Sequence, residues 1–175
     1  MSGTLRVHEI YLSLQGESTF AGLPCVFIRL TGCDLRCSYC DTAYAFTGGE
    51  TLTLDSILEQ TTALAEGYPE PPLVELTGGE PLLQKETPAL LAALADRGFT
   101  VLLETSGAHD ISGVDARVHR IVDLKCPSSG ESDRNLPANL HHLRASDEVK
   151  CVIGTREDYD WAKTCLLYTS PSQRD

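Results

Sequence analysis

The chain has 175 residues, enough for one domain of the usual size of roughly 100–200 residues but too few for a complete eight-stranded β/α barrel, which needs about 250. Apolar residues make up 42% and charged residues 22% of the chain, which excludes a disordered protein. A formal net charge of -11 disfavours general binding to nucleic acid or to an anionic membrane. Residues 1–6 lack the apolar core of a secretory signal, and no stretch approaches a membrane span, so we expect a cytoplasmic protein.

Strands and helices alternate along the chain. Residues 5–14 alternate apolar and polar side chains, as in a half-buried strand, and further strands are expected at 25–30, 73–77, 99–103, 120–124 and 148–153. Helices are expected at 53–66, at 87–97 and from Thr155 to about Trp161. This order predicts an α/β fold in which five parallel strands follow one N-terminal strand.

Three of the seven cysteines, Cys33, Cys37 and Cys40, have the spacing C-x3-C-x2-C in the loop after residues 25–30. Three thiolates so close in sequence can bind three irons of a [4Fe-4S] cluster and leave the fourth iron open. The spacing also allows a zinc site completed by His8, His109 or another cysteine, although zinc loops more often carry paired C-x2-C units. The other cysteines lie in or beside apolar segments and are expected to be buried core thiols: Cys25, Cys126, Cys151 and Cys165.

A second motif follows the strand expected at 73–77 and contains Gly78, Gly79, Glu80 and Pro81. The glycines allow backbone groups to approach a ligand closely, and Glu80 and the exposed amides could meet an ammonium or a carboxylate. Alone, this sequence could be a simple turn. Its position one strand after the cysteines favours a ligand site.

Together the two motifs resemble the radical S-adenosylmethionine superfamily, and the similarity runs from Cys25 to about Trp161. The resemblance implies an abbreviated, open parallel β/α barrel, a partial TIM barrel of about six strands, here with an extra N-terminal strand. It also implies a [4Fe-4S] cluster whose open iron chelates S-adenosylmethionine. One electron then cleaves that cofactor to methionine and a 5′-deoxyadenosyl radical.

Three further segments resemble the 7-carboxy-7-deazaguanine synthase family: residues 10–17, residues 22–33, and Thr42 directly after Asp41. The resemblance implies a lyase of queuosine and 7-deazapurine biosynthesis that contracts the ring of 6-carboxy-5,6,7,8-tetrahydropterin with loss of ammonia. It implies Mg²⁺ on Thr42 and places the pterin substrate on six residues: Leu14, Gln15, Gly16, Glu17, Arg29 and Thr77.

The cofactor site is expected at the carboxyl ends of the strands, where ligands gather in parallel α/β folds. Gly79 matches the family position that contacts S-adenosylmethionine, while Lys125 could also be a simple rim charge. The complete set of candidate cofactor-binding residues is Gly78, Gly79, Glu80, Ser106, Lys125 and Ser128.

The family resemblance further implies a flavodoxin or ferredoxin-type electron donor and a homodimer. Two alternatives stay open: an activating enzyme that generates a glycyl radical on a partner protein, and a non-catalytic zinc or iron-sulfur module. The first would not need Gln15, Glu17 and Thr42, and the second leaves the glycine motif unexplained. We expect residues 1–165 to form the radical S-adenosylmethionine domain, and residues 166–175 to be an atypical, foreign or frame-shifted tail on a truncated enzyme.

Overall fold

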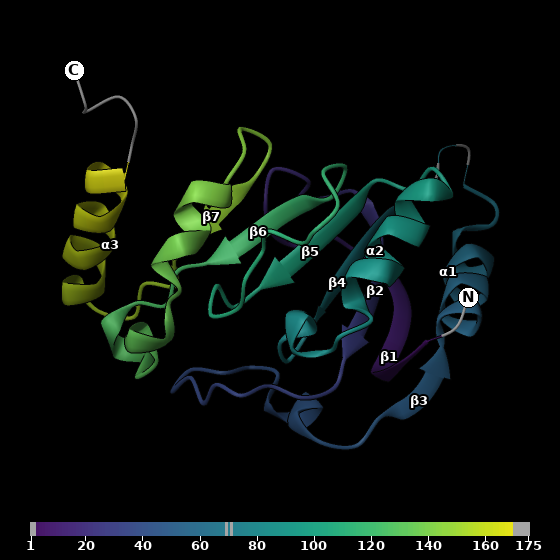
Figure 1. Cartoon of the computed structure of the whole chain (residues 1–175), viewed down its shortest axis with the longest axis horizontal. Coiled ribbons are helices and arrows are strands. Elements are labelled where there is room, and N and C mark those ends of the chain that lie inside the picture. Colours follow the sequence, from purple (N-terminus) through teal and green to yellow (C-terminus); the bar gives the residue numbers. More distant parts are fainter. Residues whose placement is uncertain (1–2, 69, 71, 170–175) are drawn as a thin grey trace.

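One mostly parallel sheet organises the chain in the computed structural model, which describes residues 3–68, 70 and 72–169 (Figure 1). The sheet has seven strands in the order β3-β1-β2-β4-β5-β6-β7. The strands are β1 (Thr4–Leu14), β2 (Pro24–Leu30), β3 (Glu50–Thr53), β4 (Leu73–Gly78), β5 (Val101–Thr105), β6 (His119–Asp123) and β7 (Glu148–Lys150). The helices are α1 (Leu54–Ala65), α2 (Thr87–Asp96) and α3 (Arg156–Thr169).

The strand directions confirm the expected open barrel. β2, β4, β5, β6 and β7 pair in parallel, and β1 joins this series antiparallel to β2. Within the described part of the chain β3 and β7 form the two edges and do not pair with each other, so the barrel stays open. The additional strand before the parallel series is also confirmed.

The edge strand β3 was not predicted, and it raises the strand count to seven. It pairs antiparallel with the first half of β1, with Thr53 opposite Thr4. Its four residues are too few to show an alternating pattern, and Thr53 also caps α1 by accepting a hydrogen bond from Ser56 N at 3.2 Å. In the sequence, Thr53 was therefore recognised as the start of a helix and not as the end of a strand.

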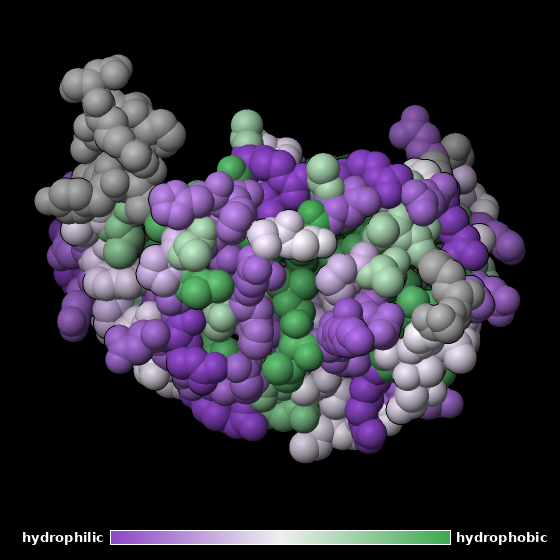
Figure 2. Space-filling view, in the orientation of Figure 1, coloured by the Kyte–Doolittle hydropathy of each residue, from purple (hydrophilic) through white to green (hydrophobic). Residues whose placement is uncertain are grey.

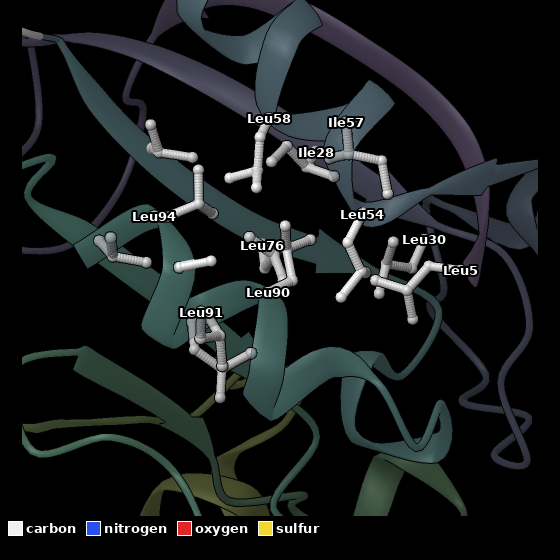
Figure 3. Packing of buried hydrophobic residues seen from close by; sticks show 14 of the residues in the cluster. Leu5, Ile28, Leu30, Leu54, Ile57, Leu58, Leu76, Leu90, Leu91 and Leu94 are labelled. Carbon is white, nitrogen blue, oxygen red and sulfur yellow. The ribbon is translucent and has the colours of Figure 1, made fainter. Parts of the chain in front are cut away.

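The main core lies between the sheet and the two helices α1 and α2, which cover the same face of the sheet (Figure 1). Figure 3 shows leucines and isoleucines of both helices directed at side chains of β1, β2 and β4. These fully buried residues include Leu5, Ile28, Leu30, Leu54, Ile57, Leu58, Leu76, Leu90, Leu91 and Leu94. Each such side chain contributes roughly 1.5–3 kcal/mol on burial. In the space-filling view, hydrophilic residues predominate on this side of the molecule and hydrophobic ones gather in a strip near its centre (Figure 2).

The second half of the chain departs from strict strand-helix alternation. The connection from β5 to β6 lacks an α-helix in the described residues, and the connection from β6 to β7 is made of short 3-10 turns. β7 ends at Lys150 rather than near residue 153. α3 continues past Trp161 to Thr169, across the expected boundary at residue 165, whereas residues 170–175 of the predicted tail lie outside the described residues.

A buried ion pair holds these irregular connections together. Arg120 at the start of β6 and Asp147 before β7 each have side chains only 1% exposed and contact each other through both carboxylate oxygens. Arg120 Nη1 also donates to Ile111 O at 3.1 Å, and Arg144 N donates to Asp147 Oδ2 at 2.7 Å. Because both charges are fully paired in a dry site, removing one partner would leave the other uncompensated.

Of the helices that the structure describes, none combines the length and the apolar character needed to cross a membrane.

Candidate active site

A cavity of about 510 Å³ lies at the carboxyl ends of the parallel strands. Residues at or just after the ends of β2, β4, β5, β6 and β7 line it, together with the segment after β1 and the loop that carries the three cysteines. This loop runs along the lower edge of the molecule in Figure 1. The cavity is therefore where a parallel α/β fold is expected to bind its ligands.

All three motif cysteines, Cys33, Cys37 and Cys40, line this cavity. The far end of their loop is fastened to the segment after β6, since Ser38 N donates to Ser129 O at 2.9 Å and Ser38 Oγ to Ser128 O at 2.7 Å. Burial raises the pKa of the Cys33 and Cys37 thiols, so binding iron as thiolates would require proton loss.

The donor set suits an iron-sulfur cluster better than a single ion. Among the described residues, no three His, Cys, Asp or Glu side chains are placed to hold one metal ion. A [4Fe-4S] cluster takes one thiolate on each of three irons, so its ligands surround a cavity instead of converging on one point. Three soft thiol ligands around one cavity fit that requirement.

The glycine motif lies directly against the start of the cysteine loop. Glu80 N donates to Gly32 O at 2.8 Å, and Gly79 N to Leu30 O at 3.2 Å. A Cβ on Gly79 would lie 2.0 Å from Gly32 O, and a Cβ on Gly78, whose φ is +139°, would lie 2.2 Å from Leu30 O. Only glycine fits at both positions, because the two backbone segments are in contact there.

Glu80 uses its carboxylate within the protein. It is fully buried, its Oε1 accepts hydrogen bonds from Leu82 N at 2.8 Å and Thr105 Oγ1 at 2.9 Å, and its Oε2 accepts one from Ser106 N at 2.7 Å. It lies outside the cavity lining, whereas Ser106 lies within it. Glu80 thus fixes the end of β4 to the end of β5, and its expected contact with the cofactor stays a prediction.

Five of the six expected substrate residues line the cavity, and one does not. Gln15, Gly16, Glu17, Arg29 and Thr77 line the cavity, whereas the side chain of Leu14 lies outside the lining and is largely solvent-exposed.

Arg29 is held firmly at the end of β2. Its Nε donates to Glu9 Oε1 at 2.8 Å and its Nη2 to Tyr11 Oη at 2.9 Å. Burial opposes the charge of Arg29, but the hydrogen bonds to Glu9 and Tyr11 outweigh it and raise the pKa of the guanidinium. The cavity thus has a permanent cation in a fixed orientation.

A second cation, Lys125, lines the cavity beside Asp123, with Nζ 2.6 Å from Asp123 Oδ2. Burial opposes the Lys125 charge, but Asp123 outweighs it and raises the lysine pKa. The other carboxylate oxygen, Asp123 Oδ1, is buried and has no hydrogen-bond partner in the described part of the chain. An unpaired buried acceptor next to a cation fits a ligand that carries both an amino and a carboxylate group.

Of the remaining candidates, Thr42 lines the cavity and donates its hydroxyl hydrogen bond to Asp41 Oδ1 at 2.7 Å. Ser128 lies outside the lining, and its backbone N–H donates to Asp158 Oδ1 at 2.8 Å.

Five charged residues in the cavity were not among the sequence candidates: Asp41, Glu75, Glu104, Asp123 and Lys150. Lys150 forms ion pairs with Glu104 Oε1 at 2.6 Å and with Glu17, and Glu104 Oε2 accepts a hydrogen bond from Thr77 at 3.2 Å. Glu75 and Glu104 each lie within an apolar strand. A charge in that context is the sequence signal that could have revealed them, because it is costly to bury without a function or a partner.

The comparisons with known proteins agree with this geometry. The profile of the radical SAM superfamily matches residues 27–128, more than half of the chain. A 7-carboxy-7-deazaguanine synthase from Chlorobaculum tepidum is 48% identical over 166 residues, which are 93% of this chain and 73% of that protein. The enzyme of the same name from Koribacter versatilis is 46% identical over 160 residues, 91% of this chain and 69% of that protein.

The chain belongs to the 7-carboxy-7-deazaguanine synthase family. A crystal structure of QueE from Escherichia coli has the same fold, with a TM-score of 0.79 and 26% identity over 98% of this chain and 80% of that one. Membership in this radical SAM family identifies the cofactors as a [4Fe-4S] cluster and S-adenosylmethionine. The cavity that Cys33, Cys37 and Cys40 help to line is the part of the described structure whose donors fit these cofactors.

Proposed function

We propose that this chain converts 6-carboxy-5,6,7,8-tetrahydropterin into 7-carboxy-7-deazaguanine, with loss of ammonia, on the route to queuosine and other 7-deazapurines. The observation that carries the proposal is that the cysteine triad and the polar residues Gln15, Arg29 and Thr77 line one cavity of about 510 Å³. This volume is in the ordinary range for small-molecule sites, roughly 300–1,000 Å³. A [4Fe-4S] cluster held by Cys33, Cys37 and Cys40, together with S-adenosylmethionine, would supply the radical chemistry needed to remove hydrogen from C6 of the pterin.

Arg29 is the proposed partner of the pterin carboxylate. Its contacts with Glu9 and Tyr11 use Nε and one N–H of Nη2, so further N–H groups of the five on the guanidinium can face the cavity. A guanidinium held by two other groups loses little conformational freedom when it binds. Arg29 would thereby fix the end of the substrate that bears the reacting C6.

Lys125 and Asp123 are the proposed partners of the amino acid part of S-adenosylmethionine. The ammonium of Lys125 attracts a carboxylate, and the unpaired Asp123 Oδ1 can accept a hydrogen bond from an amino or hydroxyl group. Gly78 and Gly79 line the cavity beside the cysteines with backbone alone, so a ligand on the cluster side can reach their backbone groups directly.

We further propose Mg²⁺ at Thr42, supported by the position of this hydroxyl in the cavity lining and by the carboxylate of Asp41 beside it. Mg²⁺ prefers oxygen ligands and retains several waters, so one hydroxyl with substrate oxygens can suffice. Thr42→Val keeps the shape of the side chain but removes its oxygen. We expect it to abolish the stimulation of turnover by Mg²⁺ while leaving the iron content unchanged.

The reducing electron comes, in this proposal, from a flavodoxin or ferredoxin-type protein, and the enzyme acts as a homodimer in the cytoplasm. The family resemblance supports these three points. Size-exclusion chromatography with light scattering tests the dimer, and turnover with a reduced flavodoxin in place of dithionite tests the donor.

The decisive experiment is an anaerobic turnover assay. Reconstituted protein is expected to bind about four irons per chain, to bind S-adenosylmethionine, and to form 7-carboxy-7-deazaguanine from 6-carboxytetrahydropterin and dithionite. Stoichiometric zinc without iron would contradict the proposal and favour a structural metal module. Consumption of S-adenosylmethionine only in the presence of a glycyl-radical enzyme would favour an activating enzyme.

A further inference from the structure

Glu75 is an acidic side chain in the cavity that the proposed chemistry leaves without a role. It lies in the middle of β4, between the apolar residues Val74 and Leu76, and is only 3% exposed. Val74 and Leu76 face the helices, whereas Glu75 and Thr77 face the cavity. Glu75 is therefore two residues before Thr77, a proposed substrate residue, on the same face of β4.

Glu75 contacts Gln15 directly. Gln15 Nε2 donates a hydrogen bond to Glu75 Oε2, and Gln15 Oε1 accepts one from Glu17 N at 3.1 Å. The backbone of Gln15 is fixed as well, since its N–H donates to Leu23 O at 2.8 Å. Gln15 is itself buried, so its amide would lose a partner in a dry site if Glu75 were apolar.

These contacts make Glu75 the anchor between β4 and the segment after β1. Residues 14–17, which are the last residue of β1 and the three that follow it, include four of the six residues expected to bind the pterin. In the described structure, the Gln15 side chain connects this segment to Glu75 on β4. A change in the Gln15 amide would therefore shift the substrate-binding segment without touching the cysteine loop.

We propose that Glu75 is a positioning residue that fixes the Gln15 amide, and through it residues 14–17, for binding of the pterin substrate. The role rests on the proposed function.

The charge state of Glu75 follows from its surroundings. Burial, together with the carboxylates of Glu104 on β5 and Glu17 after β1, raises its pKa to about 8, while the Gln15 hydrogen bond and Lys150 on β7 oppose the shift. The thiol of Cys25 on β2 also lies near Glu75, and burial raises its pKa to about 12. At neutral pH the Glu75 carboxyl is thus mostly protonated.

Ionisation of Glu75 would add a negative charge beside the carboxylates of Glu104 and Glu17, in the cavity proposed to bind an anionic substrate. If only the neutral form binds well, the KM for the pterin follows the neutral fraction, which falls to about one tenth at pH 9 for a pKa of about 8. We expect the wild-type KM to rise about 10-fold between pH 7 and pH 9, with a smaller change in kcat.

Two substitutions separate the hydrogen bond from the charge. Glu75→Gln keeps an oxygen that accepts from Gln15 and cannot ionise, so its KM should stay within about twofold of wild type at pH 7 and show no rise to pH 9. Glu75→Leu removes the acceptor and should raise the KM about 10-fold at pH 7 with kcat within about threefold. A rise with pH in Glu75→Gln equal to that of the wild type would overturn the role.

A double-mutant cycle tests whether Glu75 acts through Gln15. Gln15→Met and Glu75→Leu remove the two sides of the same bond, so the double variant should have the KM of Gln15→Met alone. Multiplying effects on KM would show that Glu75 acts by another route and would refute the proposal.

Iron content and affinity for S-adenosylmethionine serve as folding controls, because the Gln15–Glu75 bond does not involve the cysteine loop. If Glu75→Leu loses iron, the pH profile of Glu75→Gln decides the question alone. Wild-type turnover of the pterin with an unchanged KM in well-folded Glu75→Leu would remove only the role of Glu75. Absence of pterin turnover in wild-type protein would instead overturn the proposed function, and this role with it.

Discussion

Replacing Gly79 with alanine tests the contact between the glycine motif and the cysteine loop with a single added carbon. The new Cβ would lie 2.0 Å from Gly32 O and 2.9 Å from the Cβ of Cys33, whereas separations under 3.0 Å are essentially never seen at real Cβ atoms. The glycine turn or the start of the cysteine loop must therefore move by about 1 Å. A displacement of this size at positioned reacting groups costs on the order of 100-fold in rate.

We expect Gly79→Ala to lower kcat/KM for the pterin about 100-fold or more and to weaken binding of S-adenosylmethionine. The assays are iron per chain after anaerobic reconstitution, calorimetric binding of S-adenosylmethionine, and turnover. Gly113→Ala is the matched control, because Gly113 is exposed and a Cβ there meets nothing within 4 Å. Normal iron content together with turnover within about threefold of wild type would refute the close-contact argument.

Three further predictions concern charge. Arg29→Lys should raise the KM for the pterin about 10-fold, because lysine keeps the charge but not the planar guanidinium. Arg117→Lys, at a half-exposed surface site, should leave this KM unchanged and serves as the control. Burial and neighbouring carboxylates raise the pKa of Glu75 from 4.5 to about 8, so between these pH values the folded state keeps a proton that the unfolded state has lost. The free energy of unfolding should therefore fall as the pH rises from about 4.5 to 8, and at pH 7 the loss should be about 3 kcal/mol. Urea titrations from pH 5 to 8 should show this slope flattened in Glu75→Gln, and equal slopes in the two proteins would contradict it. Asp147→Ala should cost about 3–5 kcal/mol and lower the Tm by about 10 °C, since Arg120 would stay buried without its partner; a loss below about 1 kcal/mol would show that Arg120 finds another partner.

Local patterns in the sequence were sufficient for most of the fold. The alternation in β1 and the apolar runs of β2, β4, β5 and β6 are properties of a few neighbouring residues, so they can be recognised without tertiary information. The same holds for the spacing of the cysteines, which are close in sequence because one loop carries them all. The short strand β3 and the missing crossover helices after β5 and β6 depend instead on pairing and packing with distant segments.

The contacts in the cavity that could not be predicted from the sequence share one physical reason. The ion pair of Lys150 with Glu17 and the hydrogen bond of Glu75 with Gln15 depend on how β7 and β4 align with a segment that is far from them in the chain. A one-residue shift in the register of β4 or β7 would direct Glu75 or Lys150 to the opposite face of the sheet. Only the three-dimensional structure could therefore show which acidic residues face the cavity and which are used within the fold.

The contact between Lys150 and Glu17 joins residues 133 positions apart, and the cysteine loop near Ser38 is fastened to Ser128, 90 positions further along. Contacts between such distant residues require long loops to close first, which makes them slow to form. During synthesis the three cysteines leave the ribosome early but acquire their support only when the segment after β6 follows. The order in which the chain is made thus separates the appearance of the cluster ligands from the completion of the pocket around them.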